Sequence, residues 1–577
     1  MLRRFYAYLL LWISLFGVSL LLSGCKRQIR EAGSQAQLSR ITVYSDQSVG
    51  KLRPIWNNFG YDEALTTLTP EGEHLLAELA RLHPEQPARI RVHHLLTSGD
   101  GTLALKWSST NVYTEDDAGT PVYDWSLIDK IMDAHTRPGL EPFVQAGFMP
   151  KALSSRPDPY TPKLTQRGMP EGMVEGGAFY PPKDYKKWEA LIEAWARHSK
   201  ERYGEATASS WLWEVWNEPE SPYWRGTPEE FFRLYDHFAA AVKRVLPNAR
   251  VGGPHVTGPG WKRGDLFMLA FLEHCRSGVN AATGGRGAPL DFIAFHAKGT
   301  TRLDEEGRVE MNLRNQLETI DTYGKIIASF PEFKDLPIFL GESDPEGCGG
   351  CPATLSPERD YRRTSQFAAY TAASFMRKQE LMARTGGDLQ GAVSWAFTFH
   401  DQPWFNGLRA LTTNKVALPV FNAFKLFAQL EEQRVRVSNP DGYTLDELIA
   451  HGVRGGRADI GAVAVRGEQR LQVLLWHYHD VAGNAPDAEI ELVIEGLPEA
   501  GSLRVSRQSV DSETANSYSA WLAMGSPQNP SAEQIEALHE AASLKRTALR
   551  DVKRNKEGLT LNITLPRQSV SLLEFTW

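Results

Sequence analysis

Charge of one sign, cysteine and long apolar runs are all scarce in this chain. Its 577 residues carry 63 Lys and Arg against 70 Asp and Glu, so the net charge is only −7. This balance argues against nucleic acid as a partner and excludes an acidic solvating tail. A composition that is 42% hydrophobic, with 48 Gly and 34 Pro, excludes a polytopic membrane protein, a collagen-like chain and a mostly disordered one. We therefore expect a folded body that is rich in tryptophan and long enough for a barrel and a further domain.

One long apolar run does occur, at residues 5–22, directly behind two arginines. This pattern predicts an export signal, and its ending, Leu22-Ser23-Gly24-Cys25, resembles a bacterial lipobox. We expect residues 1–24 to be a lipoprotein signal peptide and Cys25 to carry the lipid, although the run is also long enough for a plain membrane-spanning anchor. The polar stretch 26–40 is then a tether, and the body lies in the bacterial cell envelope, lipid-anchored and facing the periplasm or the exterior.

Only three cysteines remain after such processing: Cys275, Cys348 and Cys351. An oxidising compartment permits one disulfide, and Cys348-Gly-Gly-Cys351 is the obvious pair. A C-x-x-C sequence also occurs in redox motifs and in zinc sites, but no second such motif or spaced histidine pair accompanies it here. We expect a disulfide that stiffens a loop, a buried thiol at Cys275, and no metal or cofactor.

Between residues 51 and 430 one pattern recurs eight times, a short apolar run followed by a longer segment with helical periodicity. The runs are short enough for buried parallel strands, and they are Trp56–Gly60, Ala88–His94, Glu141–Gly147, Trp211–Val215, Arg250–Gly253, Phe292–His296, Ile338–Gly341 and Ala392–Phe397. Eight strand-then-helix units predict an α/β fold of the TIM (β/α)8 barrel type. In such a barrel the chemistry lies where the strands end and the loops begin.

Two helices between these runs have clear signals. One is predicted to start at Thr227-Pro228-Glu229-Glu230, where the threonine caps, the proline suits the first turn and Glu230 completes a capping box. Its apolar residues keep to one face, and Pro247-Asn248 stops it. A second helix is predicted over Lys183–Tyr203 from its apolar stripe.

After residue 430 the pattern changes to strands. The predicted strands are Ile460–Val465, Leu471–His477, Ala488–Ile494, Leu503–Ser506 and Leu559–Thr576. We expect residues 431–577 to form a smaller all-β sandwich domain, with a polar, helical insertion near residues 513–544. Residues 25–50 are the tether and the possible first strand of this domain, because Ile41–Tyr44 resembles a strand.

Two of the predicted strand ends carry a glutamate. Glu218 lies in Trp216-Asn217-Glu218-Pro219 after the fourth strand, and Glu342 lies in Gly341-Glu342-Ser343-Asp344 after the seventh. These ends can face each other across the mouth of a closed barrel. Glycosidic bond cleavage needs two opposed carboxylates, one protonated and one ionised. Either motif alone is often structural, but the combination favours catalysis, with Glu214 deeper in the fourth strand as a structural group.

The barrel as a whole resembles glycoside hydrolase family 39, a family of retaining glycosidases with paired glutamates. The segments that carry the resemblance are Ile90–His93, Tyr123–Ser126, Glu141–Val144, Gly147–Pro150, Tyr180–Tyr185, Glu214–Pro219, Gly252–Pro254, Asp291–Phe292 with His296, and Pro419–Leu426. The resemblance implies that Glu218 is the acid/base and Glu342 the nucleophile, with Asn217 placed for a sugar 2-hydroxyl or the nucleophile. It also implies that Arg91 lies beside the nucleophile and that His93 and His296 line the first subsite.

The resemblance leaves the sugar open. The segments Glu342–Pro345 and His296–Gly299 are similar to the iduronidase branch of the family, whereas most matched segments are shared with the xylosidase branch. Lys298 would hold the carboxylate of a uronosyl substrate; with a neutral sugar it must pair with an acid, and Asp344 is the nearest candidate in the motif. We expect a pentose-containing (xylosyl or arabinosyl) plant-type oligosaccharide or polysaccharide as substrate, with a uronosidase of the iduronidase type as the alternative.

Several residues have a structural interpretation beside the functional one. Trp395, at the eighth strand end, and Trp404, in the loop beyond it, could stack on a sugar, yet many of the 16 tryptophans must belong to the core. Arg91 and His93 could pack and hydrogen-bond inside the barrel, and Lys298 could be a solvated loop charge.

Other classes of protein compete with a hydrolase. A glycan-binding lipoprotein without activity would keep the aromatic lining but tolerate loss of a carboxylate, and both carboxylates are present. A solute-binding transport lipoprotein would have two doubly wound lobes instead of eight consecutive units. A transglycosylase fits the same residues, because a retaining site can pass its glycosyl intermediate to another sugar. The oligomeric state is left open by the sequence.

Overall fold

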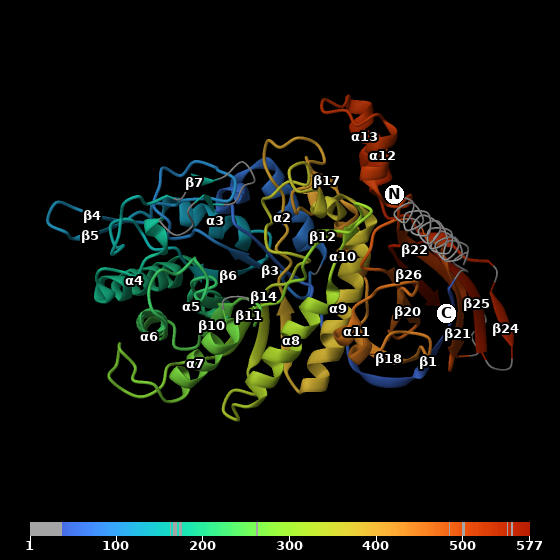
Figure 1. The fold of residues 1–577 in the computed structure, drawn as a ribbon, viewed down its shortest axis with the longest axis horizontal. Coiled ribbons are helices and arrows are strands. Elements are labelled where there is room, and N and C mark those ends of the chain that lie inside the picture. Colours follow the sequence, from blue (N-terminus) through green and yellow to red (C-terminus); the bar gives the residue numbers. More distant parts are fainter. Residues whose placement is uncertain are drawn as a thin grey trace, which may run out of the picture.

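Two bodies make up the structure, a barrel of parallel strands ringed by helices and a separate body of mostly antiparallel strands (Figure 1). This computed structural model describes residues 37–82, 84–161, 163–164, 170–171, 176–260, 263–483, 485–498, 502–550, 552–555 and 558–577. The predicted signal peptide and Cys25 lie outside the described residues. None of the helices in these ranges combines the length and the hydropathy that a membrane span requires.

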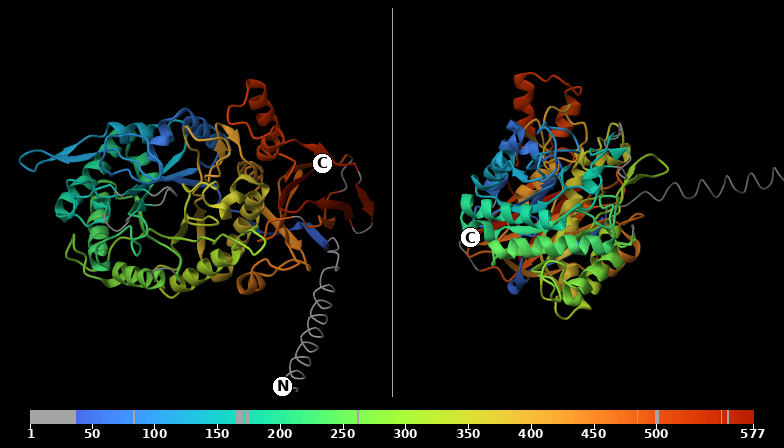
Figure 2. Two further views of the ribbon diagram at one scale, coloured as in Figure 1. Left: turned by 45° about the horizontal axis from the view of Figure 1, so that its top comes forward. Right: turned by 90° about the vertical axis from the view of Figure 1, so that its left-hand side faces the viewer.

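Eight parallel strands form the barrel, which confirms the predicted fold. In chain order they are β2 (Asn58–Tyr61), β3 (Arg89–Val92), β6 (Glu141–Ala146), β9 (Leu212–Val215), β10 (Arg250–Val256), β11 (Phe292–His296), β14 (Pro337–Glu342) and β15 (Asp388–Ala392). Each strand pairs with the next, and the ring closes where Ser394, just beyond β15, exchanges backbone hydrogen bonds with Gly60 and Asn58, both at 2.9 Å. The helices surround this ring on the outside (Figure 2).

The eighth strand lies earlier than the sequence indicated. It spans Asp388–Ala392, not Ala392–Phe397, because two polar residues, Asp388 and Gln390, alternate with buried ones and hide the strand pattern. The apolar residues that follow serve a different purpose. Val393 and Trp395 join Phe143, Leu212, Phe292, Ala294 and Phe339 in a cluster formed mainly by residues of the barrel strands. The apolar residues after Ala392 are therefore apolar because they pack inside the barrel, and not because they belong to strand β15.

The barrel helices follow the expected signals. They are α2 (Pro70–Leu82), α3 (Ser126–Thr136), α4 (Tyr185–Tyr203), α6 (Pro228–Val245), α7 (Gly264–Ser277), α8 (Leu313–Ala328), α9 (Ser365–Thr385) and α10 (Pro419–Phe427). Thr227 and Glu230 form the predicted capping box of α6, and such a cap stabilises a helix by about 1 kcal/mol. The second predicted helix is α4, which begins two residues later than expected because Asp184 caps it.

The β domain is one continuous sheet of ten strands. Their order is β23 (Thr547–Ala548), β22 (Arg504–Val510), β26 (Ser569–Thr576), β20 (Arg470–Tyr478), β19 (Asp459–Arg466), β18 (Gln433–Ser438), β1 (Gln37–Lys51), β21 (Ala488–Glu495), β25 (Gly558–Leu565) and β24 (Lys553–Asn555). Its two halves share one core, as in a sandwich: Leu471 and Phe575 from one half cluster with Leu492 and Leu561 from the other. Strand β1 pairs with β18 and β21, as Ile41–Tyr44 predicted, and it begins at Gln37, inside the stretch expected to be a tether.

The two bodies meet along α9. Strand β20 has alternating faces: Leu471, Val473 and Leu475 enter the core of the β domain, whereas Leu474, Trp476 and Tyr478 join the larger core that contains α9. Arg377 of α9 donates to Asp459 of β19 at 2.8 Å. The insertion at 513–544 is helical, with α12 (Ser517–Ala523) and α13 (Ala532–Ala541), and it projects above the sheet (Figure 1).

Candidate active site

Glu218 and Glu342 lie at the carboxyl ends of β9 and β14 and face each other across one histidine. Nδ1 of His296, at the end of β11, is 2.9 Å from Oε1 of Glu218 and 3.8 Å from Oε1 of Glu342. An oxygen of each carboxylate and this nitrogen all lie within 4.8 Å of one another. Trp216 and Glu218 both have left-handed backbones, with φ of 71° and 48°, a conformation that is uncommon outside glycine and that clusters at functional sites.

The surroundings of the two glutamates push their pKa values in opposite directions. Burial raises the pKa of the Glu218 carboxyl to about 7, and the negative charge of Glu342 adds to the rise. Burial acts in the same direction on Glu342, but the positive charge of Lys298, with smaller contributions that include Arg91, outweighs it and holds the pKa of Glu342 well below its usual range. Near neutral pH one carboxyl can therefore keep a proton while the other is ionised, which is the division that acid-assisted bond cleavage requires.

Arg91 ties the two strand ends together from inside the barrel. Its side chain is fully buried on β3, where Nε donates to Oε1 of Glu214 at 2.7 Å and Nη2 donates to Oδ1 of Asn217 at 3.0 Å. Nη1 lies 3.5 Å from Oε1 of Glu342. Glu214, predicted to be structural, also pairs with His255. A buried guanidinium bound to three strand-end groups fixes their relative positions.

His93 lies beside the same site, but its partner was missed in the sequence. Nδ1 of His93 is 2.9 Å from Oδ1 of Asp62, and Nε2 is 3.9 Å from Oε1 of Glu342. Oδ2 of Asp62 accepts a hydrogen bond from Nζ of Lys106. Asp62 directly follows β2, so the strand-end rule applied to Glu218 would have found it. Lys106 lies in the long loop after β3, where no sequence pattern singles it out.

Lys298 does not pair with Asp344, the acid that the sequence motif suggested. Its Nζ donates to Oε2 of Glu342 instead. Asp344 turns away to accept the backbone N–H of Trp395 at 3.0 Å, and it lies 3.7 Å from the guanidinium of Arg409. Side chains at successive positions after a strand end point in different directions. The order of residues in the motif therefore did not reveal that Glu342, and not Asp344, faces Lys298. Asp344 therefore orients Trp395 and does not contact Lys298.

The two candidate tryptophans lie in different surroundings. Trp395 is buried; its ring centroid is 4.3 Å from that of His93, and the guanidinium of Arg91 lies 5.1 Å from it. Trp404 is only half-buried, and its backbone N–H and C=O exchange hydrogen bonds with the side chain of Gln528 in the helical insertion. Of the two tryptophans, Trp395 therefore contacts residues beside the carboxylates, whereas Trp404 contacts the helical insertion.

A disulfide joins Cys348 and Cys351 in the loop that follows β14, while Cys275 is a buried free thiol.

Within the described part of the chain, the trio Glu218, His296 and Glu342 is the group whose ligand atoms are close enough to hold a metal ion. The ammonium of Lys298 already bonds Glu342, and its positive charge disfavours a second cation there.

The sequence and structure are similar to known proteins over nearly the whole described chain. Residues 39–557 match the family model of Glycosyl hydrolases family 39. A beta-xylosidase of Geobacillus stearothermophilus is 28% identical over 472 residues, 79% of this chain and 81% of that protein. An alpha-L-iduronidase of Canis lupus familiaris is 27% identical over 408 residues, 67% of this chain and 59% of that protein. A monomeric beta-xylosidase of Caulobacter crescentus has the same fold, with a TM-score of 0.69 at 20% identity over 94% of this chain and 99% of that one.

Proposed function

Since this chain belongs to the glycosyl hydrolases family 39 and is a retaining glycosidase, we propose that it releases a xylosyl or arabinosyl unit from a plant-type glycan or oligosaccharide. The space shared by Glu218 and Glu342 carries the proposal, because their nearest oxygens lie within 4.8 Å while their pKa values diverge. A carboxyl separation of about 5 to 5.5 Å suits a covalent intermediate, whereas inversion needs about 6.5 to 9.5 Å to admit a water molecule.

The two glutamates divide the proposed reaction. Glu218 gives its proton to the glycosidic oxygen while a carboxylate oxygen of Glu342 attacks the anomeric carbon. The bond from that carbon to the leaving oxygen breaks, and a glycosyl ester of Glu342 forms. Glu218, now ionised, then takes a proton from water, whose oxygen attacks the anomeric carbon and frees Glu342. The amide oxygen of Asn217 is occupied by Arg91, so its N–H groups are left to donate to the sugar 2-hydroxyl.

The charges around the two carboxylates favour a neutral sugar. The ammonium of Lys298 is bonded to Glu342 and that of Lys106 to Asp62, so each lysine of the site already has an acidic partner. A uronosyl carboxylate would have to compete with these carboxylates for a cation. The alternative, a uronosidase of the iduronidase type, is supported by the segment His296–Gly299 and by the similarity to an alpha-L-iduronidase.

A screen of aryl glycosides tests the substrate. The purified protein should cleave a β-xyloside or an α-L-arabinofuranoside with retention, followed by NMR of the first-formed product, and should leave an α-L-iduronide intact. Intact plant and uronate-containing polysaccharides extend the screen. Turnover of an iduronide or glucuronide, with none on xylosides or arabinosides, would overturn the pentoside proposal. Binding of a glycan without turnover would instead support a glycan-binding lipoprotein.

We also propose that the protein is a lipoprotein of the bacterial cell envelope, anchored through Cys25. The basic start, the apolar run at residues 5–22 and the lipobox-like ending support this location. Cys25→Ser should release active protein from the membrane fraction. An unchanged membrane fraction would favour a spanning anchor.

A further inference from the structure

We propose that Lys106 and Asp62 form the wall of the sugar subsite that recognises the glycone hydroxyls farthest from the anomeric carbon. The pair would thereby decide which sugar the enzyme accepts. This inference rests on the proposed glycosidase function and adds to it the residues that select the glycone.

The pair lies at the end of a chain of contacts that starts at the proposed nucleophile. Oε1 of Glu342 is 3.9 Å from Nε2 of His93, Nδ1 of His93 is 2.9 Å from Oδ1 of Asp62, and Oδ2 of Asp62 accepts from Nζ of Lys106. All of these side chains are at least nine-tenths buried, with Lys106 only 8% exposed. A sugar whose anomeric carbon meets Glu342 would extend along His93, so its C3 and C4 hydroxyls would reach Asp62 and Lys106.

Lys106 and the neighbouring His93 have polar atoms that are still able to form hydrogen bonds with a ligand. An ammonium carries three N–H donors, and among the described residues Nζ of Lys106 donates to Asp62 alone. Nε2 of His93 is buried with no hydrogen-bond partner among the described residues. Because the ionised Asp62 can only accept, Nδ1 of His93 carries the proton and Nε2 is an acceptor. The wall thus offers both donors and acceptors to sugar hydroxyls.

Aromatic rings link the pair to the catalytic strand ends. The ring of Tyr223 stacks on that of Phe148, with the centroids 5.6 Å apart. Burial raises the pKa of the Tyr223 hydroxyl, and the charges of Lys106, Asp62, Glu218 and Glu342 all act on it as well. The ring of Phe148 lies 6.0 Å from that of His93 and 5.2 Å from that of Trp216, which precedes Asn217 and Glu218. These ring contacts connect the pair to the strand end that carries Glu218.

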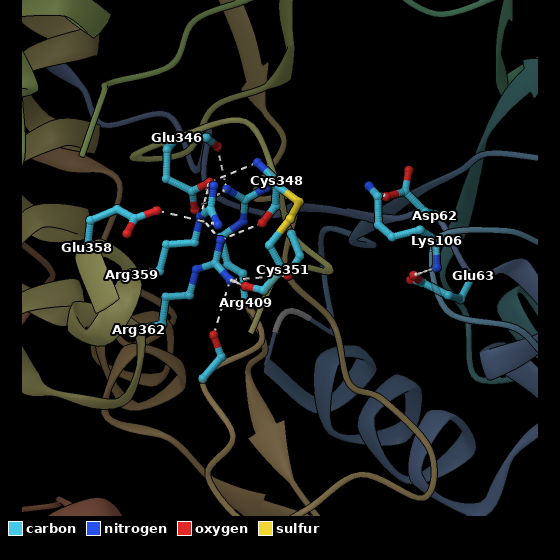
Figure 3. The surroundings of a disulfide bond; sticks show 12 residues. Asp62, Glu63, Lys106, Glu346, Cys348, Cys351, Glu358, Arg359, Arg362 and Arg409 are labelled. Carbon is cyan, nitrogen blue, oxygen red and sulfur yellow. Dashed lines mark hydrogen bonds and ion pairs between the residues drawn. A yellow bond between two sulfur atoms is a disulfide. The ribbon is translucent and has the colours of Figure 1, made fainter. Parts of the chain in front are cut away.

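The disulfide loop, which we define as residues 345–356, keeps Lys106 in position. A Cβ added at Gly350 would lie 2.4 Å from Cδ of Lys106, so the backbone of this loop packs directly against the lysine stem. Figure 3 shows Cys348 and Cys351 between Lys106 on one side and a cluster of arginines on the other. From that cluster, Arg362 donates to the carbonyl oxygen of Cys351 at 2.6 Å. On the opposite side, the backbone N–H of Lys106 donates to Oε1 of Glu63 at 2.6 Å. A lysine held from both sides is preorganised for binding.

Lys106→Met tests this role, because it keeps the length of the side chain and removes the ammonium. On the parent glycoside found in the screen, kcat/KM should fall by about 10- to 100-fold, the value of a charge-assisted hydrogen bond. On the 3-deoxy or 4-deoxy analogue, where the wild type is already slow, the same substitution should cost less than about threefold. Equal losses on the parent and on both deoxy analogues would overturn the proposal, because they would mean a merely structural role.

Lys243→Met is the matched control. Lys243 bonds the carbonyl oxygen of Ala249 at 2.7 Å and pairs with Asp291, beside the starts of β10 and β11 at the opposite end of the barrel. Lys243→Met should leave unchanged the ratio of kcat/KM on the parent substrate to kcat/KM on the deoxy analogues. If Lys106→Met does not fold, Asp62→Asn replaces it. We expect the same result: a large loss of kcat/KM on the parent glycoside and a small loss on the deoxy analogues.

The experiment separates this inference from the proposed substrate. If the wild type cleaves a glycoside other than a pentoside, the pentoside proposal fails, and the deoxy comparison on that other glycone still decides the role of Lys106. If no glycoside is cleaved, calorimetry with xylose and its deoxy analogues supplies the ratio from binding. A wild type that binds none of these sugars overturns both proposals.

Discussion

Nζ of Lys298 donates a hydrogen bond to Oε2 of Glu342, so the lysine and the proposed nucleophile form one charged unit. The lysine is 16% exposed and the glutamate 6%, which places the pair where water screens it weakly. A carboxylate that is held ionised by its own cation is ready to attack an electrophilic carbon across a wide range of pH. The same contact leaves the lysine without a free charge for the substrate.

Lys298→Met should therefore impair all substrates alike. We expect kcat/KM to fall by about 100-fold or more on neutral and acidic glycosides, because the loss lies in the nucleophile and not in sugar recognition. Lys298→Arg, which keeps the charge, should retain more activity and is the matched control. A loss confined to uronides would contradict the pairing as a functional contact and would support the uronosidase alternative.

The pH dependence of kcat/KM should follow the two pKa shifts. The reaction needs Glu342 ionised and Glu218 protonated. Because the pKa of Glu342 is held well below its usual range, activity should stay level through mildly acidic pH. Because the pKa of Glu218 is raised to about 7, activity should fall as the pH rises above that value and the proton is lost. Glu218→Gln, assayed on an activated aryl glycoside, should abolish this alkaline fall; its persistence would assign it to another group.

Removal of the proton donor should depend on the leaving group. Glu218→Ala should reduce turnover of alkyl glycosides by about 100- to 10,000-fold, because their leaving oxygen needs a proton. Nitrophenyl glycosides, whose leaving group is acidic, should be largely spared in the first step. Burst kinetics separate that step from hydrolysis of the intermediate. Equal losses on both kinds of substrate would contradict the assignment of Glu218.

Loss of the proposed nucleophile should be rescued chemically. Glu342→Gly should abolish turnover, and azide should restore it by attacking the anomeric carbon from the vacated side. The azide takes the place of the carboxylate, so the glycosyl azide should have the configuration opposite to the substrate, as NMR can establish. Glu214→Gly is the control, since Glu214 is buried behind Arg91, and azide should not rescue it.

The disulfide should contribute to both stability and sugar binding. For a loop of this size, replacing Cys348 and Cys351 with alanine should cost about 2 kcal/mol of unfolding free energy. Because Gly350 packs on Lys106, we also expect a higher KM with a smaller effect on kcat. Reduction of the wild type should reproduce both changes and leave the double variant unaffected. An unchanged KM would show that the disulfide loop does not need the bond to hold Lys106.

The barrel could be predicted from the sequence because its signals are local. A buried parallel strand is a short apolar run, its helix has a 3.6-residue period, and eight repeats of that unit leave few other folds. The same rule placed Glu218 and Glu342 at the mouth, and the tertiary structure brings them together. The rule misplaced the eighth strand for two reasons. The polar residues Asp388 and Gln390 interrupt the apolar pattern of the strand, and the apolar pattern continues beyond the strand to Trp395, which packs inside the barrel.

The partners of the charged residues were decided only by the tertiary structure. Lys298 pairs with Glu342, 44 positions away, and not with Asp344, and Lys106 meets Asp62 across the same separation. Ion pairs depend on distances of a few ångströms between side chains from different strands and loops, and these distances are not encoded in any local pattern. Composition, periodicity and strand ends thus determined the fold and the site of chemistry, whereas packing of the loops over the barrel mouth determined which charges meet there.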